Sequence, residues 1–174
     1  IAEKFAAIGD HLIITGRRKD RLEKLSNDLQ KDFGIKVLPL NFDVRDKETV
    51  FGEIQNLPEQ WRSIDILINN AGRSIRRAVH ESSDRFHDFE RTMQLNYFGA
   101  IRMVMNILPQ MMIRRDGHII NISSIGVLAN ATRFSAYVAS KAALDAFSRC
   151  LSAEVHSHKI AITSVYMPLV RTPM

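Results

Sequence analysis

The sequence contains a single cysteine, Cys150, among its 174 residues. One cysteine cannot form an internal disulfide bond, so the composition excludes a small disulfide-stapled scaffold. We therefore expect a reducing, cytoplasmic environment, with Cys150 as a small core residue. The histidines lack the His-x-x-x-His spacing of a metal site, and no bound metal is expected.

Long apolar runs are also absent. No stretch approaches the roughly 20 apolar residues of a membrane-spanning helix, and no signal-peptide pattern opens the chain. Internal repeats, low-complexity segments and linkers are missing as well. We therefore expect residues 1–174 to belong to one domain with a sizeable core.

Neither sign of charge gathers in a long block. The net charge is +5, but acidic residues interrupt the basic ones, as Asp20 does between Arg17-Arg18-Lys19 and Arg21. No basic stripe with interleaved aromatic residues is present. We therefore expect a small anionic partner rather than nucleic acid.

Strand and helix patterns alternate along the chain. Apolar strands are predicted at 11–15, 36–42, 64–68, 117–122 and 160–165. Helices are predicted at 1–7, 20–33, 46–57, 84–113, with a kink or break at Pro109, and 134–156. This alternation indicates an α/β fold, a Rossmann-like, doubly wound parallel sheet with helices on both faces.

Tyr137 and Lys141 carry the clearest chemical signal. Their spacing places both side chains on one face of a helix, and an ammonium beside a phenol favours the phenolate. Such a tyrosine can exchange a proton with a carbonyl or alcohol oxygen. Ser124 follows an apolar run, at a strand end where open α/β sheets bind ligands. An isolated Tyr-x-x-x-Lys pair is more often a solvated helix face, so its neighbours decide its meaning.

Those neighbours are Asn69-Asn70-Ala71-Gly72, at the end of an earlier strand, and Asn96 in the helical stretch that follows. Together with Ser124, Tyr137 and Lys141, they resemble the short-chain dehydrogenase/reductase family over nearly the whole chain. The resemblance implies hydride transfer between a nicotinamide cofactor and a carbonyl or alcohol, with those three residues and Asn96 as the catalytic set. Asn96 would hold a water that relays protons to Lys141; the alternative is a polar residue at a helix kink.

The same resemblance implies where the adenosine half of the cofactor binds. Arg17 follows Gly16, the position at which NAD-binding folds of this kind have an acidic residue. A guanidinium there can bind a 2′-phosphate through bidentate hydrogen bonds. Arg17, with Arg18 as helper, would thus select NADP over NAD; the alternative is a solvated arginine in a turn. Asp43 and Val44 would hold the adenine, and Asp43 is equally suited to cap a helix.

The nicotinamide half is assigned by the same family pattern. Asn70, Ala71 and Gly72 would approach the cofactor, with Asn70 also tying neighbouring strands together. Tyr137 and Lys141 would bind the nicotinamide ribose. Thr172 would contact the carboxamide, although Met167-Pro168 stands where the family has Pro-Gly.

The glycine-rich turn of the family, Gly-x-x-x-Gly-x-Gly, does not occur in the sequence. The first predicted helix also has no strand before it. We therefore expect an internal fragment of a longer enzyme, truncated at both ends, which is inactive and poorly folded on its own. Beside the missing central strand, Ile13, Val37 and Leu67 are expected to be exposed.

Two parts of the chain resemble different branches of the family. From about Ile68 onward the sequence resembles bacterial fatty acyl-CoA reductases, in residues 70–80, 86–91, 124–130 and 166–174. Residues 12–18 and 57–65 resemble NADP-dependent serine and 3-hydroxy acid dehydrogenases. The favoured substrate is a fatty acyl thioester or fatty aldehyde. The alternatives are a small 3-hydroxy acid such as serine, or no chemistry at all in a NADP-binding sensor or interaction module.

Two further expectations concern binding partners. Arg73, Arg76 and Arg77 directly follow the Asn-Asn-Ala-Gly motif and would meet the phosphates of coenzyme A, or else form a solvated basic loop. The methionine-rich helix at 84–113 corresponds to one that forms dimer contacts in the family. The resemblance therefore implies a homodimer or homotetramer.

Overall fold

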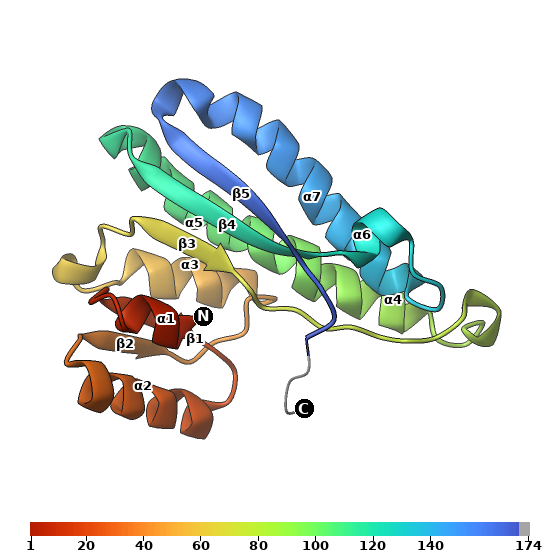
Figure 1. The fold of residues 1–174 in the computed structure, drawn as a ribbon, viewed down its shortest axis with the longest axis horizontal. Coiled ribbons are helices and arrows are strands. Elements are labelled where there is room, and N and C mark those ends of the chain that lie inside the picture. Colours follow the sequence, from red (N-terminus) through yellow and green to blue (C-terminus); the bar gives the residue numbers. More distant parts are fainter. Residues whose placement is uncertain (171–174) are drawn as a thin grey trace. The chain divides into compact units, whose positions relative to one another are not determined.

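A computed structural model describes residues 1–170 and divides the chain into two compact units, Ile1–Trp61 and the part from Arg62 onward. Figure 1 shows the elements of each unit, which are described separately below. Every strand pair is parallel, and helices connect the paired strands. The predicted Rossmann-like α/β class is therefore confirmed.

The first unit has a two-stranded parallel sheet, β1–β2. Gly34 ends the helix between these strands in the left-handed conformation, with φ 67°, as its position in the sequence predicts. Ala6, Leu29, Ile35 and Val37 form the core of this unit. Its elements are α1 (Ala2–Ala6), β1 (Leu12–Thr15), α2 (Lys19–Phe33), β2 (Val37–Leu40), α3 (Lys47–Gln55) and a 3₁₀ turn (Glu59–Trp61).

The second unit has a three-stranded parallel sheet in the order β3-β4-β5. Its helical elements are a 3₁₀ turn (Val79–Glu81), α4 (Phe86–Met93), a π-helical segment (Gln94–Phe98), α5 (Gly99–Arg114), α6 (Gly126–Ala129), α7 (Ser135–Val155) and a 3₁₀ turn (His156–His158). Its strands are β3 (Ile66–Asn69), β4 (Gly117–Ser124) and β5 (Ile160–Met167).

The helices α5 and α7 pack on the same face of this sheet. Gly117 and Asn121 lie on one face of β4, because alternate residues of a strand point the same way. A Cβ atom on Gly117 would lie 2.6 Å from Sδ of Met111 in α5. On the same face, Asn121 donates a hydrogen bond to Ser148 of α7. Right-handed crossovers, the rule for parallel strands added in one direction, place the connecting helices on one face of a sheet.

The region predicted as one helix at 84–113 differs from expectation. Its interruption is the π-helical segment Gln94–Phe98 rather than Pro109, which lies inside the continuous helix α5. A π-helical turn holds one residue more than an α-helical turn and occurs often at functional sites. Here it contains Asn96, which is only 1% exposed.

Three expectations about burial are wrong. Val37 and Leu67 are buried, at 8% and 7% exposure. Val37 packs in the core under α2, and Leu67 lies on β3, which contacts both β4 and α5. Cys150 is exposed rather than in the core, because it lies one position before the buried Leu151 and on another face of α7.

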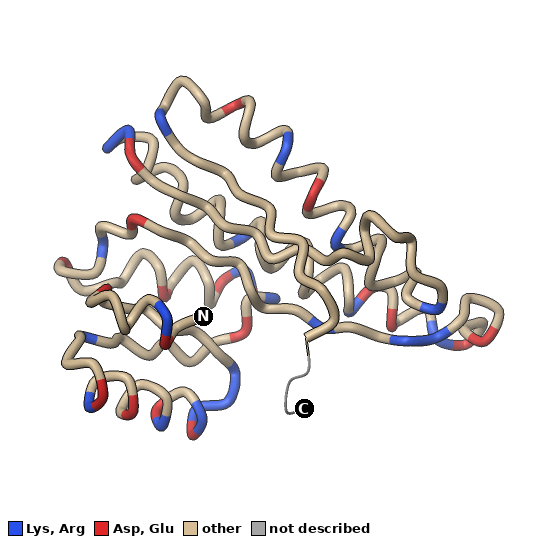
Figure 2. The backbone as a smooth tube through the Cα atoms, in the orientation of Figure 1, with Lys and Arg blue, Asp and Glu red and all other residues tan. Residues whose placement is uncertain are grey.

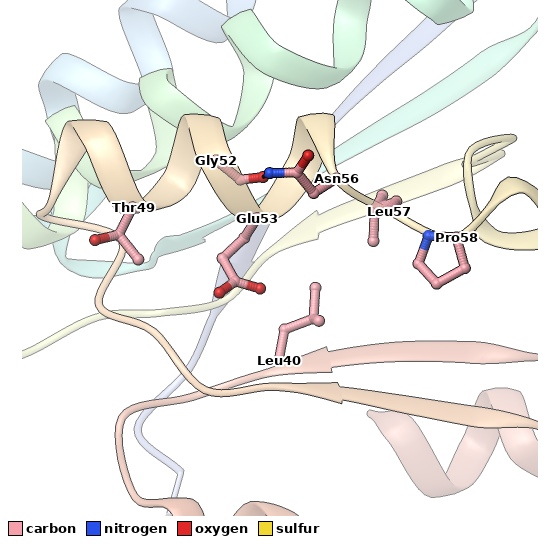
Figure 3. A pocket seen from close by; sticks show the side chains of 7 residues that line it. All are labelled: Leu40, Thr49, Gly52, Glu53, Asn56, Leu57 and Pro58. Atoms are coloured by element: carbon pink, nitrogen blue, oxygen red, sulfur yellow. Dashed lines mark hydrogen bonds between the residues drawn. The ribbon is translucent and has the colours of Figure 1, made fainter.

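A hollow lies on the surface of the first unit. It measures about 290 Å³ and is lined by residues of α3, β2 and the segment after α3 (Figure 3). None of the candidate site residues lines it. Among the helices of residues 1–170, none combines the length and apolar character that crossing a membrane requires.

Candidate active site

Tyr137 and Lys141 lie on α7, one helical turn apart, as predicted. The helix begins at Ser135, after Arg133 and Asn130 turn the chain with left-handed φ angles of 68° and 50°. Tyr137 is half-buried and its ring packs edge-on against Phe134, with 6.5 Å between the ring centroids. The first turn of α7 thus fixes the position of the phenol.

Lys141 is a buried cation, with only 4% of its surface exposed. Its Nζ donates a hydrogen bond of 2.6 Å to the main-chain oxygen of Ile122 on β4. Burial disfavours the ammonium and lowers the pKa of Lys141 from 10.5 to about 8. A buried lysine of this kind is costly for the fold and is typical of functional sites.

Gly72 brings Lys141 and Asn96 together. A Cβ atom on Gly72 would lie 3.4 Å from Oδ1 of Asn96 and 3.5 Å from Nζ of Lys141. Three elements therefore meet here: the end of β3, the π-helical segment and α7. The small residue in the Asn-Asn-Ala-Gly motif leaves space beside both polar groups.

Asn96 is held from two sides. Its Oδ1 accepts a hydrogen bond from the amide of Arg73 at 2.8 Å, and its Nδ2 donates to the Arg73 carbonyl at 2.9 Å. Nδ2 also donates to Oγ of Ser140, at 2.9 Å. Ser140, which the sequence analysis missed, is fully buried and donates to the carbonyl of Tyr137 at 2.7 Å. Asn96 thus joins the segment after β3 to the N-terminal part of α7.

Ser124 is the last residue of β4, where the sequence predicts a ligand-binding strand end. Its Oγ accepts a hydrogen bond from the amide of Gly126 at 3.1 Å. A Cβ on Gly126 would lie 3.3 Å from that oxygen and 3.4 Å from Val138, the residue after Tyr137. Gly126 therefore lets Ser124 approach the start of α7 closely.

The tie between neighbouring strands is made by Asn69, and the expectation that Asn70 provides it is wrong. Asn69 is buried and its Nδ2 donates to Oδ1 of Asn121 on β4 at 2.8 Å. Asn121 in turn donates to Ser148 on α7 at 2.8 Å. Asn70 is exposed because consecutive residues at a strand end point in opposite directions. Ala71 and Gly72 are exposed beside it.

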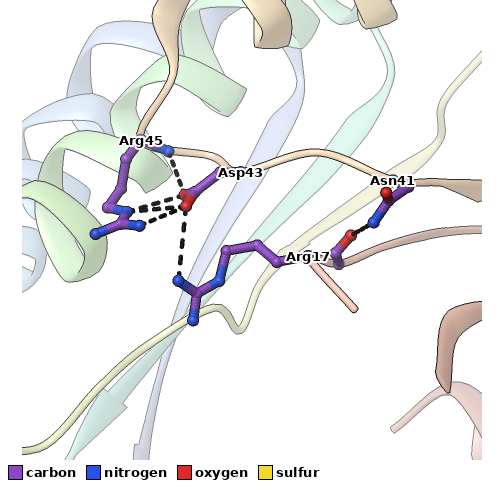
Figure 4. Close-up of polar contacts among 5 residues, drawn as sticks. Arg17, Asn41, Asp43 and Arg45 are labelled. Atoms are coloured by element: carbon purple, nitrogen blue, oxygen red, sulfur yellow. Dashed lines mark hydrogen bonds and ion pairs between the residues drawn. The ribbon is translucent and has the colours of Figure 1, made fainter. Parts of the chain in front are cut away.

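The remaining predicted cofactor residues lie in the first unit, except Thr172, which is outside the described residues. Arg17 follows β1 and is 60% exposed, with Nη1 3.7 Å from Oδ2 of Asp43 (Figure 4). Arg18 is exposed and precedes α2, and Val44 is half-buried beyond β2. Asp43 does not cap α3: Asp46 does, accepting a 3.1 Å hydrogen bond from the amide of Thr49.

Among the described residues, no three His, Cys, Asp or Glu side chains gather as metal ligands would. The catalytic candidates of the second unit therefore amount to a tyrosine, a buried lysine, a serine at a strand end and a buried asparagine. This set can exchange a proton with an oxygen atom and donate hydrogen bonds to it.

Two known proteins show what the chain is similar to. A fatty acyl-CoA reductase of Acinetobacter baylyi is 62% identical over 175 residues, covering 100% of this chain and 59% of the relative. An NADP-dependent 3-hydroxy acid dehydrogenase of Salmonella typhi is 36% identical, covering 98% of this chain and 66% of the relative. The first match spans both parts of the chain that resemble different branches. The chain thus covers about three fifths of the first relative's length.

A solved structure gives the same result for the fold. The closed form of a serine dehydrogenase complexed with NADP+ matches with a TM-score of 0.90 and 32% identity, covering 98% of this chain and 66% of that one. The family model described as short chain dehydrogenase matches residues 1–174. The chain therefore belongs to the short-chain dehydrogenase family.

Proposed function

We propose that the protein is an NADP(H)-dependent oxidoreductase that transfers hydride between the nicotinamide and a carbonyl or alcohol carbon. The observation that carries the proposal is the buried Lys141, which lies beside Gly72 with Asn96 and one helical turn from Tyr137. We further propose that residues 1–174 belong to a single dinucleotide-binding domain. Relatives that use NADP, and a matching structure that binds it, support the cofactor.

The residues present fit such a cofactor. Gly72 leaves room beside two polar groups, and the largely exposed Arg17 offers a guanidinium for a 2′-phosphate. Arg18 would assist it, and Asp43 and Val44 would hold the adenine. Asn70, Ala71, Gly72, Tyr137 and Lys141, with Thr172, would hold the nicotinamide ribose and carboxamide. When bound, the nicotinamide supplies or accepts the hydride.

The chain's own residues handle the oxygen of the substrate. Ser124 takes a hydrogen bond from Gly126, so its own O–H is directed elsewhere and can donate to the substrate oxygen as negative charge develops there. Tyr137 donates its phenolic proton to that oxygen in reduction, and Lys141 supplies a positive charge one helical turn away. Asn96 and the Arg73 main chain fix the site from which a water would return the proton through Lys141.

We propose a fatty acyl thioester or fatty aldehyde as the substrate. Large apolar side chains next to Ser124 in the chain or the sheet are exposed: Ile125 at 47%, Leu128 at 62% and Met167 at 36%. Leu169, two residues after Met167, is 98% exposed. The segments that carry them are adjacent, since the Ile125 amide donates to the Met167 carbonyl at 3.0 Å. Exposed apolar patches of this kind mark binding surfaces, and an acyl chain matches their chemistry.

Arginines after β3 suit the phosphate-bearing coenzyme A part of the thioester. Arg73, Arg76 and Arg77 are exposed, and no acidic residue lies between Ala71 and His80. Figure 2 shows basic residues along this extended segment. Guanidinium groups bind phosphates in paired hydrogen bonds, so these residues would hold the coenzyme A phosphates.

The mechanism is tested by Tyr137→Phe in the full-length protein. We expect turnover to fall by at least about a hundredfold, because general acid–base catalysis contributes about 10²–10⁴-fold. The affinity for NADPH should stay within a few-fold, since the ring is retained. Turnover close to that of the unaltered protein would remove Tyr137 from the mechanism.

The substrate is tested by two assays on the same preparation. NADPH oxidation with palmitoyl-CoA is measured against NADP+ reduction with serine. The second candidate, a serine or 3-hydroxy acid dehydrogenase, is favoured by the match to the serine dehydrogenase structure. Activity on serine alone would overturn the acyl thioester. NADPH binding without turnover of any carbonyl in a broad panel would instead favour a cofactor-binding sensor or interaction module.

A further inference from the structure

Arg45 is a basic residue of the first unit that the proposed function leaves unused. It lies five positions after the end of β2, and its side chain hydrogen-bonds to the carboxylate of Asp43 (Figure 4). Nε of Arg45 lies 3.0 Å from both carboxylate oxygens, and Nη2 lies 2.6 Å from Oδ2. The amide of Arg45 donates to Oδ1 at 3.0 Å as well.

Arg17 shares the same carboxylate but is held far less tightly. Its Nη1 is 3.7 Å from Oδ2 of Asp43, which is beyond hydrogen-bonding distance. Its side chain is 60% exposed, against 39% for Arg45. Asn41 fixes the turn before it by donating a 2.7 Å hydrogen bond to the Gly16 carbonyl. Arg17 is therefore positioned while its donors remain available.

One carboxylate thus faces two guanidinium groups, and Arg45 is the one that engages it. The Arg45 hydrogen bonds hold the pKa of Asp43 below its usual value, so the carboxylate is ionised at neutral pH. An ionised carboxylate without Arg45 would draw Arg17 from its present 3.7 Å ion pair into direct hydrogen bonds. It would also repel a phosphate placed near Arg17.

We infer that Arg45 determines cofactor specificity by occupying Asp43, so that Arg17 stays available for the 2′-phosphate of NADP(H). Arg45 is a positioning residue in this scheme, because it acts through Asp43 and Arg17. The inference rests on the proposed cofactor and adds a residue that the family resemblance did not assign. The chemistry recognised is a phosphate monoester on a nucleoside ribose.

The test is a fluorescence titration of NADPH and NADH against variants of the full-length protein. Arg45→Met should weaken NADPH binding about tenfold, the range of one lost charge-assisted hydrogen bond, and NADH binding by less than about twofold. Adding Asp43→Asn to Arg45→Met should restore the ratio of NADPH affinity to NADH affinity, because no carboxylate remains to capture Arg17. Loss of the proposed adenine contact would weaken both cofactors alike and leave that ratio unchanged. Lys24→Met, an exposed charge on α2, is the matched control and should leave both affinities unchanged.

The competing explanations give different results. If Arg45 bound the phosphate itself, the second substitution would not restore the preference. If Arg45 served only to order the loop, both cofactors would lose affinity equally; α3 retains its own cap at Asp46, so the fold should survive. Either result would overturn the inference. An unaltered protein that binds NADH more tightly than NADPH would overturn the proposed cofactor itself, and with it the role of Arg45.

Discussion

At the residue scale, burial of the Lys141 ammonium carries an electrostatic cost. The ammonium is buried, and the single hydrogen bond to the Ile122 carbonyl replaces little of its hydration. The pKa of Lys141 is lowered to about 8 in the folded chain, against an ordinary value of 10.5. Between these two values the unfolded chain binds more protons than the folded one, so stability rises with pH.

This predicts a pH-dependent difference between the unaltered protein and Lys141→Met. The difference in the free energy of unfolding, unaltered protein minus variant, should increase by about 2–3 kcal/mol from pH 7 to pH 10. The reason is that each pKa unit is worth about 1.4 kcal/mol. Urea unfolding at several pH values measures it. The variant Lys24→Met, whose side chain is exposed, should show no such change. Curves for Lys141→Met and the unaltered protein that stay parallel would contradict the prediction.

Most catalytic candidates could be found from the sequence because their spacing is local. Tyr137 and Lys141 are one turn apart on a helix, and Ser124 follows an apolar strand. Ser140 could not be found this way, since its role depends on Asn96, a residue far away in sequence. Its signal would have been a serine three positions after Tyr137, on the same face of the helix. Asn69 was overlooked because a strand-end pattern does not say which of two asparagines points inward.

At the scale of elements, the contact between α5 and β4 depends on one glycine. A Cβ on Gly117 would meet Cγ and Sδ of Met111 at 2.6 Å and its Cβ at 2.9 Å. Met111 is completely buried, so it cannot swing into solvent. The approach of the helix to the sheet is therefore set by the absence of a side chain at the start of the strand.

We therefore expect Gly117→Ala to destabilise the protein by about 1–3 kcal/mol, the usual cost of overpacking a core. Gly52→Ala is the matched control: Gly52 lies inside α3 with nothing within 4 Å of the added Cβ. That change should be neutral or stabilise by up to about 1 kcal/mol, because alanine favours a helix. Denaturant unfolding of both variants decides the point, and equal free energies for the two would refute it.

The interruption in the helical region before β4 was placed wrongly for a physical reason. Proline usually breaks or kinks a helix, because it lacks an N–H and its ring clashes with the preceding turn. The helix α5 nevertheless continues through Pro109. The structure shows where the wider turn belongs: the buried residues Asp88, Thr92, Asn96, Ala100 and Val104 recur every four positions. An α-helix repeats every 3.6 residues, so a strict period of four requires a wider turn somewhere.

At the scale of the whole chain, the order of element types was predictable and their pairing was not. Alternating apolar strands and amphipathic helices follow from local periodicity. Periodicity does not say that Ile66 pairs with His118, or that β3, β4 and β5 form a sheet separate from β1 and β2. Those contacts depend on residues distant in sequence. The misjudged burial of Val37 and Leu67 arose from the same lack of long-range information.

Overall charge gives a further prediction about the cofactor. The chain carries a net charge of +5, and Arg17 is largely exposed. A 2′-phosphate near it should therefore feel a screened attraction that NADH lacks. Raising the salt concentration from about 50 mM to about 500 mM should weaken NADPH binding several-fold more than NADH binding. Parallel salt dependence of the two affinities, measured by titration, would argue against a phosphate contact.

The helix α7 has a consequence for how the sequence can change over time. Tyr137, Lys141 and Ser148 follow one another along the helix, and the last two contact β4. One helix therefore carries the phenol, the ammonium and the hydrogen bond to Asn121. Inserting or deleting one residue between them would rotate everything beyond it by about 100°. Insertions and deletions in descendants of this sequence should therefore be confined to the loops, while the length of α7 stays the same.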